Sequence, residues 1–109
     1  MPPGKLAAQA GHAFLDAYLT ALDLRPEAAR AYRDGGHGAK VALRATSLDD
    51  LVRAQSMARR AGIPSALVTD AGHVLPPDFD GSPVVTALGL GPAKRSEVRR
   101  ITRHFALVP

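Results

Sequence analysis

The chain has 109 residues, no cysteine, a formal net charge of +4 and a pI near 10.1. Its length predicts a single domain over residues 1–109, and the lack of cysteine excludes a disulfide framework and thiol catalysis. Since no apolar run is long enough to cross a bilayer and no signal-peptide pattern is present, we expect a cytoplasmic protein. The mildly basic net charge suits a polyanionic partner.

The first predicted element is a helix from Gly4 to about Leu22 with two distinct faces. One face is apolar and consists mostly of alanine: Leu6, Ala10, Ala13, Ala17 and Ala21. These small side chains allow the helix to pack closely on a neighbouring element. The other face carries a cation, an amide, an imidazole and a carboxylate, a set suited to binding and proton transfer: Lys5, Gln9, His12 and Asp16. A solvated polar face is the alternative interpretation of this second stripe.

A second short helix is expected over residues 27–33, because Pro26 suits the first turn of a helix. The glycine-rich segment 34–38 must be a loop, since three glycines would be costly in a regular element. This segment lacks the ending of a phosphate-binding P-loop, so we interpret it as a connector.

The middle of the chain predicts a strand, a helix and a second strand. Residues 40–45 alternate weakly as a strand does, and Ser47 begins a helix that Gly62 closes. Residues 65–69 form a short apolar strand. A strand–helix–strand unit of this length predicts that the two strands are parallel. Asp70 then lies at a carboxyl strand end, where open α/β sheets bind ligands.

The last part of the chain predicts a loop over residues 73–83, a strand from Val84 to Leu90 and a final helix. Val98, Ile101 and Phe105 recur at the spacing of an inward helix face. The opposite side of this helix is basic: Lys94, Arg95, Arg99, Arg100 and Arg103. A short edge strand is expected over residues 106–108.

Few residues are able to carry catalysis. The chain has neither a serine nucleophile elbow nor a catalytic cysteine, and its four histidines are too scattered for a metal motif. Any hydrolysis must therefore use an activated water. Asp70 and Lys5 are candidates. Asp70 could instead cap a turn, since Asp-x-Gly is common in turns. Lys5 lies near a helix start, where the helix dipole disfavours a cation, and its alternative interpretation is a solvated side chain.

Four segments resemble the type II peptidyl-tRNA hydrolases, the archaeal and eukaryotic class, and they occur in the order found in that family. The segments are Gly4-Lys5-x-Ala-Ala-Gln9-x-x-His12-Ala13, Lys40–Ala45, Asp70-Ala71-Gly72 and Thr86–Pro92. The resemblance extends from Gly4 to Val108. It implies an α/β fold with a small mixed β-sheet flanked by helices on both faces.

The resemblance also implies an activity, namely hydrolysis of the ester that joins a peptide to the terminal ribose of tRNA, without a cofactor. Asp70 would position or deprotonate the water, while Lys5 and His12 would stabilise developing charge. Gln9 would orient the ester or the terminal nucleotide. Arg99 and Arg100 on the basic helix would grip tRNA phosphates.

The chain departs from the family pattern in two places. Val74 follows the Asp-Ala-Gly segment closely, where the family usually has a threonine, so Ser82 or Thr86 is the substitute hydroxyl that we expect. The family's first strand also has no counterpart, since Met1-Pro2-Pro3 cannot form one, so either the true start lies upstream or the sheet has one strand fewer. The exposed sheet edge that results predicts a homodimer. A non-catalytic tRNA-binding relative and a small-molecule binding module are the alternative functions.

Overall fold

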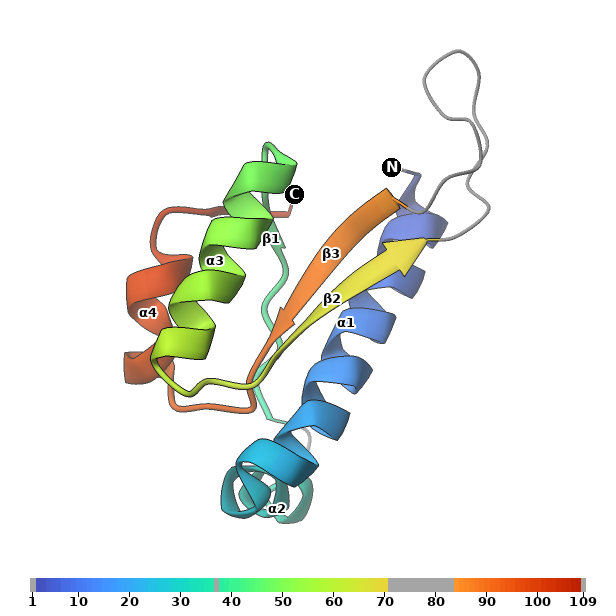
Figure 1. Ribbon diagram of the computed structural model, residues 1–109. Helices are drawn as coiled ribbons and strands as arrows, with labels where there is room; N and C mark the ends of the chain where they lie inside the picture. Colours follow the sequence, from blue (N-terminus) through green and yellow to red (C-terminus); the bar gives the residue numbers. More distant parts are fainter. Residues whose placement is uncertain (1, 37, 71–83, 109) are drawn as a thin grey trace.

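The computed structural model describes residues 2–36, 38–70 and 84–108, together with the side chains in these ranges except those of Asp70, Val84 and Val85. The elements follow one another in the chain as shown in Figure 1: α1 (Pro3–Leu24), α2 (Pro26–Asp34), β1 (Leu43–Arg44), α3 (Leu48–Arg60), β2 (Ser65–Asp70), β3 (Val84–Leu90), α4 (Arg95–Thr102) and β4 (Ala106–Leu107). The expected α/β class is confirmed. The loop predicted over residues 73–83 lies outside the described residues.

The strands form two separate antiparallel pairs, β1 with β4 and β2 with β3. The prediction of a parallel β1–β2 pair within one mixed sheet is therefore wrong. β1 is only two residues long and pairs with the end of the chain, Leu43 opposite Leu107 and Arg44 opposite Ala106. Within the described ranges, each of the four strands has one strand partner, so each pair keeps edges that no described strand covers.

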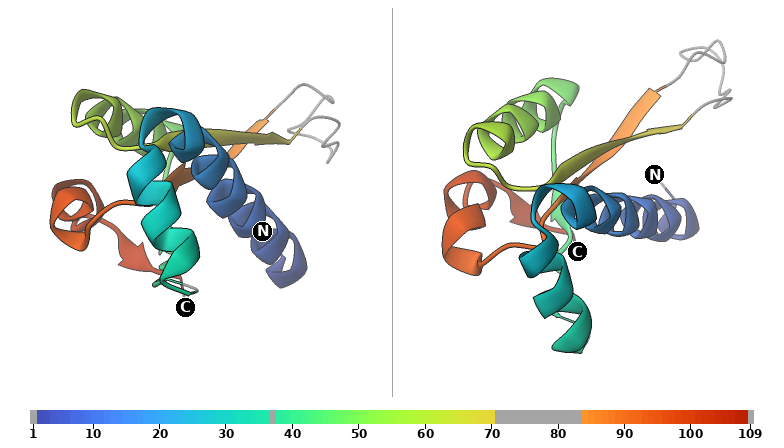
Figure 2. Two further views of the ribbon diagram at one scale, coloured as in Figure 1. Left: turned by 90° about the horizontal axis from the view of Figure 1, so that it is seen from below. Right: turned by 60° about the horizontal axis from the view of Figure 1, so that its bottom comes forward.

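Helices cover both faces of the β2–β3 hairpin, as the resemblance implies. Directly opposed residues of an antiparallel pair point to the same face. Ala66 is opposite Gly89 on the face that α1 covers, whereas Leu67 is opposite Leu88 on the other face. The second face packs against α3 and α4, where the core cluster is formed by Ala54, Ala58, Ile63 and Ile101. Figures 1 and 2 show the hairpin between these two groups of helices.

The alanine face of α1 lies directly against β3. Ala13, Ala17 and Ala21 are buried, as the helical spacing predicts. A methyl group added at Gly89 would overlap the carbonyl oxygen of Ala13 and lie 3.0 Å from the Ala17 Cβ atom. The helix therefore rests on the strand backbone, and only a glycine at position 89 permits this approach.

The predicted start and end of α3 are confirmed. The Ser47 hydroxyl oxygen accepts a hydrogen bond from the Asp50 backbone N–H at 3.2 Å, and Gly62 follows the helix with a φ of +70°. The Thr46 hydroxyl, at 2.8 Å, and the Thr46 backbone N–H donate to the Asp50 carboxylate. These hydrogen bonds from Thr46 are the main reason that the pKa of Asp50 is lowered.

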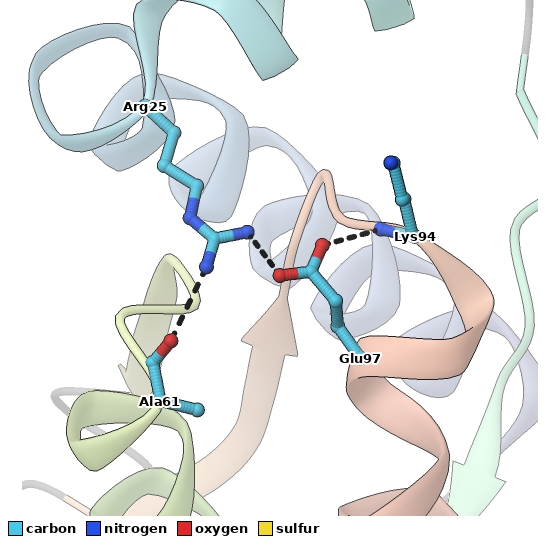
Figure 3. Close-up of polar contacts among 4 residues, drawn as sticks. All are labelled: Arg25, Ala61, Lys94 and Glu97. Carbon is cyan, nitrogen blue, oxygen red and sulfur yellow. Dashed lines mark hydrogen bonds and ion pairs between the residues drawn. The ribbon is translucent and has the colours of Figure 1, made fainter.

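One ion pair joins the beginning of α4 to the junction of α1 and α2 (Figure 3). Arg25 donates one hydrogen bond to the Glu97 carboxylate at 2.8 Å and another to the Ala61 carbonyl oxygen at 3.2 Å. The second carboxylate oxygen of Glu97 accepts from the Lys94 backbone N–H at 3.0 Å. The hydrogen bonds from Lys94 and Arg25 lower the pKa of Glu97. The ends of four helices are thus connected at one arginine.

We expect Gly89→Ala to destabilise the protein by about 1–3 kcal/mol, because the added methyl group forces α1 away from the strand backbone. Chemical denaturation followed by circular dichroism measures this change. A domain of this size should lose several degrees of melting temperature per kcal/mol.

Gly11→Ala is the matched control for this substitution. Gly11 lies in the same helix, and a methyl group there would meet no atom within 4 Å. Replacing glycine by alanine inside a helix should stabilise the protein by about 0.5–1 kcal/mol. If Gly89→Ala were as stable as the parent protein, the close approach of α1 to β3 would not constrain the fold.

Candidate active site

A pocket of about 260 Å³ lies where α1 passes the carboxyl half of β2. Its lining consists of three polar residues from α1 and three consecutive residues from β2: Gln9, His12, Asp16, Leu67, Val68 and Thr69. Two of the α1 residues, Gln9 and His12, are candidates from the sequence. The structure therefore brings the polar stripe of α1 to the strand end that the sequence indicates.

Gln9 is the most enclosed polar group in this pocket. Its side chain is only 8% exposed, and its amide makes no hydrogen bond with any other residue that the structure describes. No buried side-chain nitrogen or oxygen atom of the described residues lacks a partner, so the Gln9 amide is accessible from the pocket, where its donor and acceptor suit a ligand. His12 follows three positions later and is exposed at the same pocket.

Asp16 lines the pocket as well, although it was not among the site residues selected from the polar stripe. It lies four positions after His12 on the same side of α1, a spacing that places Cβ atoms about 5–6 Å apart. The regular spacing of Lys5, Gln9, His12 and Asp16 was the available signal. A stripe of this kind is equally typical of a solvated face, and only the position of β2 distinguishes the two.

Lys5 and Asp70 flank the same region of the fold. Lys5 lies four positions before Gln9 in α1 and is half-buried. Asp70 is the last residue of β2, directly after Thr69, and its backbone is paired with Val84. The Asp70 side chain and the segment with Val74 and Ser82 lie outside what the structure describes.

Thr86 occupies an irregular position in β3. Val68 is opposite Ala87 and Thr69 is opposite Val85, so Thr86 is the extra residue of a β-bulge. Its hydroxyl donates to the Val68 carbonyl oxygen at 3.3 Å. In this structure the hydroxyl thus binds the backbone of β2, beside the pocket but not among its lining residues.

Arg99 and Arg100 lie apart from the pocket. Both are exposed on α4, which packs against α3 on the opposite side of the hairpin from α1. Of the three residues predicted to form its inward face, Ile101 is buried and Val98 packs on the core cluster. Phe105 packs on the same cluster but lies beyond α4, which ends at Thr102. The two arginines therefore belong to a surface separate from Gln9 and His12.

The described residues were also compared with the requirements of a metal site and of a membrane-spanning helix. Among the described residues, no group of three or more histidine and carboxylate side chains is placed to hold a metal ion. No helix in the same residues combines the length and apolar character needed to span a membrane.

Comparison with known proteins finds a matching family model and several similar proteins. The family model for peptidyl-tRNA hydrolase PTH2 matches residues 1–108. A peptidyl-tRNA hydrolase of Methanocaldococcus jannaschii is 34% identical over 109 residues, 99% of this chain and 90% of the relative. Peptidyl-tRNA hydrolases of Halobacterium salinarum and Methanopyrus kandleri are 41% and 38% identical, covering 98% and 96% of this chain and 88% and 85% of the relatives.

Proposed function

Because the chain belongs to the peptidyl-tRNA hydrolase PTH2 family, we propose that it hydrolyses the ester bond of peptidyl-tRNA and releases the peptide and free tRNA. The structural observation that supports this proposal best is the pocket between α1 and β2, which joins Gln9 and His12 to the strand that ends at Asp70. A substrate produced during translation would place the protein in the cytoplasm.

In the proposed reaction, Asp70 positions a water molecule and accepts its proton as the water oxygen attacks the ester carbonyl carbon. The bond between this carbon and the ribose oxygen then breaks, and the proton that Asp70 accepted passes to the ribose oxygen, which restores the Asp70 carboxylate. Lys5 and His12 stabilise the negative charge that develops on the carbonyl oxygen. Gln9 orients the ester or the terminal nucleotide.

We expect Asp70→Asn and Lys5→Ala each to lower the rate of peptide release from peptidyl-tRNA by about 10²–10⁴-fold, the usual contribution of a proton-transfer or charge-stabilising group. Single-turnover assays with purified protein measure this rate. Asp23→Asn is the matched control, since Asp23 is an exposed carboxylate at the far end of α1.

Full activity in both variants would contradict the proposed mechanism. If the parent protein binds tRNA but releases no peptide, the non-catalytic tRNA-binding alternative would replace the proposed function. The two outcomes are distinguished by measuring tRNA binding and ester cleavage on the same preparation.

We propose that Arg99 and Arg100 bind tRNA phosphates. Both guanidinium groups are exposed on α4, and in the described structure neither makes an ion pair or a hydrogen bond through its side chain. Contacts of this kind contribute affinity that falls with salt concentration and does not depend on sequence. Their distance from the α1 pocket indicates that they would hold a part of the tRNA other than the reacting end.

Reversal of both charges, Arg99→Glu with Arg100→Glu, should weaken tRNA binding and reduce the slope of log K against log salt concentration by about two. Filter binding at several salt concentrations measures both quantities. The double reversal Arg30→Glu with Arg33→Glu on α2 changes the net charge equally and serves as the control. Equal effects of the two double variants would show that overall charge, and not contact by α4, governs binding.

We propose that the protein forms a homodimer that covers a sheet edge. The β2–β3 and β1–β4 pairs each keep an edge without a described strand partner, and unpaired strand edges readily join another chain. Exposed leucines on α1 add apolar surface available for association, among them Leu19, which is 50% exposed.

Light scattering at low micromolar concentration should give the mass of a dimer, and the melting temperature should rise with protein concentration. A monomer whose melting temperature is constant over a hundredfold range of concentration would contradict the dimer. This measurement does not depend on whether the protein is catalytic.

A further inference from the structure

A second pocket, of about 290 Å³, lies on the side of the molecule away from the α1 site. β1, α3 and the end of α4 contribute its walls, and none of its lining residues belongs to α1 or to the hairpin. The proposed hydrolysis uses no residue of this pocket. Its volume is at the lower end of the range of known small-molecule sites.

The inner part of the pocket is apolar. Met57 of α3 and Ile101 of α4 line it together with Phe105, and Ile101 is only 4% exposed. The same three side chains belong to or pack against the core cluster beneath α3 and α4. The floor is therefore held in place by the core, and a ligand on it would bury apolar surface without rearranging the fold.

The mouth of the pocket carries a surplus of positive charge. Arg44 of β1 and Arg53 of α3 both line it, and Asp50 is the only acidic residue that does. The Asp50 carboxylate already accepts two hydrogen bonds from Thr46. Arg53 acts electrostatically on Asp50, whereas Arg44 makes no ion pair or hydrogen bond through its side chain with any described residue.

We propose that this pocket binds a small organic monoanion, in which an aliphatic or aromatic body rests on Met57, Ile101 and Phe105 and a carboxylate faces Arg44 and Arg53. A guanidinium group offers paired donors that match a carboxylate, and it stays charged at every accessible pH. The two arginines and Asp50 leave one net positive charge above the apolar floor, beside the imidazole of His104. This arrangement suits a single anionic group better than a polyanion or a neutral molecule.

Octanoate is the probe for this proposal, because it combines an eight-carbon body with one carboxylate. Isothermal titration of the full chain should show binding of one octanoate per chain. Acetate, which lacks the apolar body, and 1-octanol, which lacks the charge, should each bind at least tenfold more weakly. Amide chemical shifts in β1, α3 and the end of α4 should move, while those of the α1 pocket stay unchanged.

Arg44→Met and Arg53→Met should each weaken octanoate binding about tenfold, a loss typical of one charge-assisted hydrogen bond. Arg60→Met is the matched control, since Arg60 is an exposed arginine of α3 that does not line the pocket. Both pocket substitutions are at exposed positions, and thermal melting confirms that each variant is folded.

No octanoate binding at millimolar concentration, or equal weakening by Arg60→Met, would overturn the proposal. Equal binding of octanoate and 1-octanol would overturn the role of the arginines. Because all of these measurements are made without tRNA, they fail or succeed independently of the proposed hydrolase activity.

Discussion

The direct contact between α1 and the backbone of β3 at Gly89 is the packing constraint on which the rest of the molecule depends. Alanines on the helix and a glycine on the strand bring the two elements closer than larger side chains would permit. This spacing determines where the opposite edge of the helix meets β2. Gln9 and His12 line a common pocket with Thr69 because the helix is held at this distance. The packing of the fold and the geometry of the candidate site therefore depend on one contact.

The hairpin divides the molecule into two sides with different chemistry. On the α1 side, an amide, an imidazole and a carboxylate line a pocket beside the end of β2. On the other side, an apolar pocket with two arginines at its mouth lies among β1, α3 and α4. Arg25 connects the sides, since its guanidinium bonds both Glu97 of α4 and the Ala61 carbonyl at the end of α3.

Local sequence signals predicted the elements well but not their pairing. Ser47 and Gly62 mark the ends of α3 because a cap hydroxyl and a left-handed glycine satisfy backbone groups locally. The partner of β1 depends on parts of the chain that are distant in sequence. An alternating pattern indicates that residues 40–45 suit a strand, yet it carries no information about whether β2 or the end of the chain lies beside them. The structure pairs only Leu43 and Arg44, and it pairs them with β4.

The sequence by itself determined the family resemblance, the helical stripe that carries Lys5, Gln9 and His12, and the strand that ends at Asp70, because periodicity and short motifs are local properties. Only the tertiary structure decided that Asp16 lines the same pocket, that the Thr86 hydroxyl binds the Val68 carbonyl oxygen, and that Arg99 and Arg100 lie on another surface. The physical reason is that the chemical type of a side chain is known from the sequence. Which residues lie next to it depends on how α1 and α4 pack on opposite faces of one hairpin.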